Sequence, residues 1–75
     1  MRVLVVEDDT AIRTALVQAL SEDGYAVDGT GDGEEGLWYA ERNDYDLLVL
    51  DLNLPGLDGL ELLKRVRDGE RHPAV

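Results

Sequence analysis

Acidic side chains directly follow two short apolar runs of the sequence. Glu7 and Asp8 come after residues 3–6, and Asp51 comes after residues 47–50. Carboxylates that lie close together repel one another, which raises their pKa values unless a cation neutralises them. A hard divalent ion suits such a cluster, and Mg²⁺ takes one or two protein carboxylates together with water and phosphate oxygens. These residues are therefore candidates for an acidic magnesium pocket.

Both apolar runs have the form of a strand that is buried on two faces. Residues 3–6 and 47–50 show no polar alternation, and short runs bounded by turn signals are typical of parallel sheets. A Pro-Gly and an Asp-Gly pair follow Asp51, so residues 51–57 are expected to form a loop at the carboxyl edge of the sheet. Open α/β sheets place their ligands at that edge.

Helical patterns separate the predicted strands. Residues 10–22 carry apolar side chains at helical spacing, and Gly24 stands where that helix would stop. Residues 25–28 are also predicted to form a strand, although their pattern is weaker. Asp32, followed by Glu three positions later, predicts a capping box and a second helix that runs through about Arg42.

The two predicted helices have inward and outward faces. The positions expected to face the sheet are Ile12, Ala15, Leu16, Ala19, Leu20, Leu37, Trp38 and Ala40. The positions expected to face solvent in the first helix are Arg13, Gln18 and Glu22. Gly36 lowers the helix propensity of the second by about 1 kcal/mol relative to alanine. Of the adjacent rings of Trp38 and Tyr39, one is expected to be half exposed.

The alternation of strand and helix predicts an α/β fold. A third helix is expected from Asp58 to about residues 68–71, and residues 72–75 have the pattern of a fourth strand's first residues. Successive units of this kind form a parallel sheet with right-handed crossovers. The element lengths fit a flavodoxin-like, doubly wound sheet whose strand order begins 2-1-3, with the first and third strands side by side.

The composition limits the classes of function. The 75 residues suffice for one small domain, and 17 acidic against 7 basic residues give a formal net charge of -10. This charge opposes binding of nucleic acid or an anionic membrane by the segment itself. There is no cysteine for a disulfide or a thiolate metal site. No apolar run reaches the length of a signal peptide or a membrane span, so a cytoplasmic location is expected.

Three motifs surround the predicted pocket. They are Val5-Val6-Glu7-Asp8-Asp9, Asp46-Leu47-Leu48-Val49-Leu50-Asp51-Leu52-Asn53-Leu54-Pro55-Gly56 and Asp58-Gly59-Leu60-Glu61-Leu62-Leu63. Together they resemble the receiver domain of bacterial two-component response regulators, which has a CheY-like fold. The context of Gly24-Tyr25 and Tyr45-Asp46-Leu47 is most similar to the OmpR-type transcription regulators. Residues 1–75 would be the N-terminal part of such a domain, truncated after three βα units at the start of the fourth strand.

The resemblance implies roles for four residues. Asp51 would accept a phosphoryl group from a sensor histidine kinase and would also bind Mg²⁺. Asp8 would bind the ion directly, Glu7 would bind it through water, and the backbone carbonyl of Asn53 would complete the protein ligands. A carboxylate can attack a phosphoryl group once a metal offsets the repulsion between the two anions. Asp9 is expected to cap the first helix instead.

The resemblance also implies residues beyond Val75. A Thr or Ser on a fourth strand and a Lys on a fifth would assist the transfer, and an output domain of the parent protein would bind DNA. The implied role is signalling, so an enzyme is not expected. An aspartyl-phosphate hydrolase is an alternative, although Asn53 stands where such phosphatases place a second carboxylate as general acid.

A second alternative is an assembly unit that does not signal. Residues 47–50 would lie at an open strand edge, and such an edge pairs readily with another chain. A homo-oligomer is therefore expected, most simply a dimer through this edge or through Ala74-Val75. The glycine-rich residues 29–33 are predicted to be a flexible turn. Their spacing matches neither glycine-rich phosphate fingerprint, and Asp32 would repel a phosphate.

Overall fold

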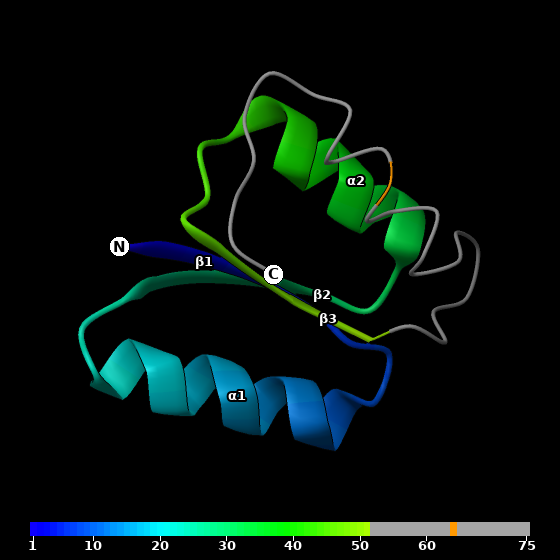
Figure 1. The fold of residues 1–75 in the computed structure, drawn as a ribbon. Coiled ribbons are helices and arrows are strands. Elements are labelled where there is room, and N and C mark those ends of the chain that lie inside the picture. The colour runs from blue at the N-terminus through cyan, green and yellow to red at the C-terminus, as the bar shows by residue number, and fades with distance from the viewer. Residues whose placement is uncertain (52–63, 65–75) are drawn as a thin grey trace.

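The computed structural model describes residues 1–51 and residue 64. The elements are β1 (Arg2–Val6), α1 (Thr10–Glu22), β2 (Ala26–Thr30), α2 (Gly33–Arg42) and β3 (Leu47–Leu50). The three strands form one parallel sheet in the order β2-β1-β3, with α1 on one face and α2 on the other (Figure 1). The predicted α/β architecture and strand order are confirmed. The predicted third helix and fourth strand lie outside the described residues, apart from Lys64, which is helical.

β1 is the middle strand and the most deeply buried element. Four successive side chains are 0% exposed, namely Val3, Leu4, Val5 and Val6. The register places Val6 beside Thr30 of β2 and Leu50 of β3. In β3 only Leu48 is buried. Burial on both faces is therefore confirmed for β1, whereas the β3 side chains other than Leu48 are only partly buried.

The ends of α1 follow from local signals. The Asp9 side chain caps the helix, with Oδ1 accepting a hydrogen bond from the Ile12 backbone N–H at 3.1 Å. Gly24 follows the helix with a φ of +92°, a conformation that glycine adopts without strain. The predicted cap, bounds and stop signal of this helix are all confirmed.

The face that α1 turns toward the sheet differs from the prediction. Ile12 is 49% exposed, and Ala15 and Ala19 are also exposed. The partly buried positions are Arg13, Leu16, Val17 and Leu20. The helix is rotated toward β2, where Gly29 leaves room for it: a Cβ at Gly29 would lie 2.9 Å from Val17 Cγ2. The outward assignment of Arg13 is therefore wrong.

The start of α2 uses the predicted cap with a different partner. Asp32 Oδ1 accepts from the Glu34 N–H at 3.1 Å. Glu35 does not return to the Asp32 N–H but accepts a hydrogen bond from the Thr30 hydroxyl at 2.7 Å, and that hydroxyl accepts from the Asp32 N–H at 3.3 Å. The threonine thus takes the place that the capping box assigns to the glutamate. Gly29 and Thr30 belong to β2, so residues 29–33 are not simply the predicted turn.

α2 packs closely on β1. A Cβ at Gly36 would lie 3.0 Å from both methyl carbons of Val6, so glycine permits the close approach of helix and strand. Leu37 is buried beside it, whereas Trp38, one residue further round the helix, is 50% exposed. The inward assignment of Trp38 is wrong, but the expectation of one half-exposed ring is confirmed. Its ring lies 4.7 Å from the Arg42 guanidinium carbon.

Candidate metal and phosphoacceptor site

The carboxyl ends of the strands meet at one edge of the sheet. The Asp51 N–H donates to the Val6 carbonyl at 2.8 Å, and the Glu7 N–H donates to the Thr30 carbonyl at 3.0 Å. These bonds extend the ladder by one residue beyond β1 and β3 on the two sides of the middle strand. They hold Glu7 and Asp51, which are 44 positions apart in the numbering, at the same level of the sheet.

The acidic side chains converge at this edge. Carboxylate oxygens of Glu7, Asp8 and Asp51 lie within 4.8 Å of one another. Glu7 and Asp51 are partly buried, and Asp8 is exposed. The structure thus brings together three of the four predicted site residues, while Asn53 lies outside the described residues. Their roles as ligands and phosphoacceptor stay predictions.

The closeness of the carboxylates changes the titration of Glu7. A hydrogen bond with Asp51 raises the pKa of Glu7 above its ordinary value, and burial and the negative charge of Asp51 act in the same direction. A hydrogen bond from the Asp9 N–H to Glu7 Oε2, at 3.3 Å, lowers it. The closeness of Asp51 therefore disfavours the charged form of Glu7 when no cation is present.

The donor set fits a small hard cation. All the converging side-chain donors are carboxylate oxygens, which suit Mg²⁺. The exposure of Asp8 leaves one side of the cluster open to water and to phosphate oxygens. An ion there would offset the repulsion between these carboxylates.

Arg13 is a neighbour of the site that the sequence did not reveal. Its Nη1 donates to the backbone carbonyl of Glu7 at 2.8 Å. The helical pattern assigned Arg13 to the solvent face because it is charged. The available signal was the pair of glycines at 29 and 31, which marks a close approach to β2, but the pair does not tell which side chain approaches.

No helix in the described part of the chain is long and apolar enough to cross a membrane. The chemistry available at the acidic edge is that of one exposed and two partly buried carboxylates.

Comparison with known proteins agrees with this geometry. The response regulator receiver domain family matches residues 3–75. Transcriptional regulatory protein HprR of Escherichia coli is 39% identical over 75 residues, covering 100% of this chain and 34% of that protein. Two-component response regulator PhoP of Pseudomonas aeruginosa is 43% identical over 76 residues, again covering 100% of this chain and 34% of the relative. The chain therefore spans about a third of the length of these regulators.

A solved relative extends the comparison to three dimensions. Response regulator TrrA of Thermotoga maritima, in complex with Mg²⁺ and BeF, is 40% identical with a TM-score of 0.86, covering 92% of this chain and 60% of that one. TrrA has also been solved in complex with histidine kinase ThkA, with a TM-score of 0.84. Because the family match extends over nearly all of the sequence and the sheet order agrees, this chain belongs to the response regulator receiver domain family.

Proposed function

We propose that Asp51 accepts a phosphoryl group from a sensor histidine kinase in a two-component signalling system. The observation that carries the proposal is the convergence of Glu7, Asp8 and Asp51 within 4.8 Å at the carboxyl edge of the sheet. The complexes of TrrA with Mg²⁺ and BeF and with a histidine kinase concern that protein, and they support the same assignment here. The ion would be Mg²⁺, held by Glu7, Asp8, Asp51 and the carbonyl of Asn53.

Each residue has a defined part in the transfer. A carboxylate oxygen of Asp51 attacks phosphorus, the bond from phosphorus to the kinase histidine nitrogen breaks, and the imidazole keeps the electron pair. Bound Mg²⁺ would supply positive charge that offsets repulsion between the carboxylates and the phosphoryl oxygens. The bond between the Asp51 N–H and the Val6 carbonyl holds the backbone of the nucleophile level with the end of β1.

In the proposed reaction the phosphoryl group stays on the protein, and no small-molecule product is released from it. The chain would act as a signalling domain in the cytoplasm, and its parent protein would contain a DNA-binding output domain. Relatives that are transcriptional regulators and about three times as long support that organisation. The net charge of -10 opposes DNA binding by this segment itself, which supports the same proposal.

The proposal is tested by labelling with acetyl phosphate in the presence of Mg²⁺. We expect a mass increase of one phosphoryl group, located on Asp51 by peptide mapping and absent from Asp51→Asn. Labelling of residues 1–75 alone is expected to be slower than labelling of a longer chain that carries the Thr or Ser and the Lys donors, because one such donor contributes about 2.7–4 kcal/mol. Asp23→Asn, at an exposed helix cap remote from the cluster, serves as the matched control and should label normally.

Two results would contradict the proposal. Continuous release of phosphate without a stable label would favour an aspartyl-phosphate hydrolase. A label that persists in Asp51→Asn would place the phosphoacceptor elsewhere.

An assembly role is the second candidate function. In the described sheet β3 pairs with β1 on one side, and Leu47, Val49 and Leu50 are only partly buried. A strand edge of this kind offers unpaired backbone groups to a second chain. Pairing between copies through β3 stays a prediction, and its test is given in the Discussion.

A further inference from the structure

The geometry points to Arg13 as a positioning residue for the acidic site. We infer that its guanidinium, which occupies the space left by Gly31, holds the Glu7 carbonyl and thereby fixes the direction of the segment that carries Glu7 and Asp8. The inference rests on the proposed function, because it concerns the cation that those carboxylates are proposed to bind.

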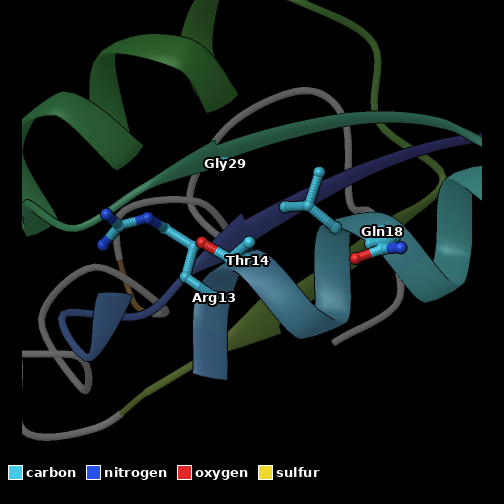
Figure 2. A pocket seen from close by; sticks show the side chains of 5 residues that line it. Arg13, Thr14, Gln18 and Gly29 are labelled. Atoms are coloured by element: carbon cyan, nitrogen blue, oxygen red, sulfur yellow. The ribbon is translucent and has the colours of Figure 1, made fainter. Parts of the chain in front are cut away.

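Arg13 links α1 to the first residue after β1. Its Nη1 donates to the Glu7 carbonyl at 2.8 Å, and its Nη2 lies 3.5 Å from the Thr10 hydroxyl as a weaker second bond. Figure 2 shows the Arg13 side chain extending from α1 along β2 near Gly29. The planar guanidinium presents several donors in a fixed arrangement, so it restricts the direction of the carbonyl it binds more than an ammonium group would.

Two glycines of the neighbouring segment make room for this side chain. A Cβ at Gly31 would lie 2.6 Å from Arg13 Nη1, and a Cβ at Gly29 would lie 3.5 Å from Arg13 Cγ. The backbone conformation at these two positions does not require glycine. In the part of the chain that the structure describes, the glycine with a positive φ is Gly24. Space for Arg13 therefore explains the glycine at position 31.

The contact completes the support of Glu7. Its N–H is held by the Thr30 carbonyl at 3.0 Å, and its own carbonyl is held by Arg13. The second bond sets the peptide plane between Glu7 and Asp8, and so the directions in which both side chains leave the backbone. Groups that orient metal ligands without touching the ion commonly change metal affinity by about 10- to 100-fold.

The positive charge of Arg13 acts against its positioning effect. A guanidinium near the cluster repels a divalent cation, so removing the charge would by itself strengthen Mg²⁺ binding. A useful test therefore keeps the charge and changes only the contact. Gly31→Ala keeps the charge and displaces the Arg13 guanidinium from the Glu7 carbonyl. Arg13→Lys keeps the charge and replaces the planar guanidinium with a single ammonium group.

The experiment is a titration of the chain with Mg²⁺, in which binding is monitored by calorimetry and by the NMR shifts of the backbone amides. We expect Gly31→Ala and Arg13→Lys each to weaken Mg²⁺ binding about tenfold. Arg42→Lys, an equal change at the exposed end of α2, should bind as the wild type does. In the metal-free protein the carbonyl ¹³C shift of Glu7 should move in the first two variants and not in the control. Thermal melts identify any loss that comes from unfolding.

A double variant tests whether the two changes act through the same contact. Gly31→Ala combined with Arg13→Lys should bind no more weakly than the weaker single variant, because both remove one interaction. Losses that add would overturn the inference, as would single variants that bind Mg²⁺ as tightly as the wild type or leave the Glu7 carbonyl shift unchanged. Failure of the wild type to bind Mg²⁺ is a different result, which refutes the proposed metal site and this inference with it.

Discussion

Tyr45 joins three segments at the amino end of the sheet. Its hydroxyl donates to Asp28 Oδ2 at 2.6 Å, and the same oxygen lies 3.3 Å from Arg2 Nη2. The Arg2 guanidinium carbon lies 5.0 Å from the centre of the Tyr45 ring, and the tyrosine is only 7% exposed. Burial raises the pKa of Tyr45 above its ordinary value, and the hydrogen bond to Asp28 raises it further. The folded chain therefore holds this phenol in its neutral form.

The raised pKa of Tyr45 predicts a loss of stability in alkali. As the pH rises above about 10, the unfolded chain releases the phenolic proton before the folded chain does. The contribution is complete below that pH and disappears as the pH approaches the folded-state value. We expect the free energy of unfolding, measured with urea, to fall as the pH rises from about 10 to about 12 in the wild type and to fall less in Tyr45→Phe. Tyr25→Phe, at a more exposed ring, should keep the wild-type slope, and equal slopes in all three proteins would contradict the argument.

The helices show which structural features are encoded locally. Asp9 and Gly24 define the ends of α1 through their own side chain and backbone, so the bounds of the helix could be predicted from adjacent residues. Its rotation could not, because it depends on the room that Gly29 and Gly31 leave on β2 for Val17 and Arg13.

The convergence of the acidic residues could also be predicted from the sequence, but for a different reason. Glu7 and Asp51 follow apolar strands, and the topology of a parallel sheet brings such ends to one edge. The contact of Arg13 with Glu7 could not be predicted, since helical periodicity gives no sign of a side chain that turns back to a strand.

Gly36 sets two effects on α2 against each other. Alanine would gain about 1 kcal/mol in helix propensity, whereas overpacking of a well-packed interface costs about 1–3 kcal/mol. A Cβ only 3.0 Å from both Val6 methyl carbons makes the second effect the larger one. We therefore expect Gly36→Ala to destabilise the wild type in urea unfolding.

A shortened partner should reverse the sign of that effect. In a Val6→Ala background the methyl carbons are gone, and Gly36→Ala should then stabilise the chain relative to Val6→Ala alone. A stabilising Gly36→Ala in the wild type would show that α2 moves away from β1 at little cost.

The whole molecule carries a strong negative charge, and within the described sheet β3 has β1 as its one strand neighbour. A net charge of -10 opposes self-association, and added salt screens that repulsion. We therefore predict by sedimentation that the fraction of dimer rises from low to moderate salt. Val49→Lys, on β3, should abolish the dimer, whereas Ser21→Lys, which adds the same charge on exposed α1, should not. A folded monomer at high protein concentration under both conditions would refute pairing through β3.

The position of β1 in the chain has a consequence for biosynthesis. Its buried residues are made before either neighbouring strand, and β3 follows about 40 residues later, which takes roughly 2–8 s at ribosomal rates of about 5–20 residues per second. During that time Val3, Leu4, Val5 and Val6 form an uncovered apolar segment of high β propensity. Charged residues beside such segments suppress aggregation of nascent chains. The acids after β1 are thus positioned to protect the newly made strand until its neighbours have been synthesised.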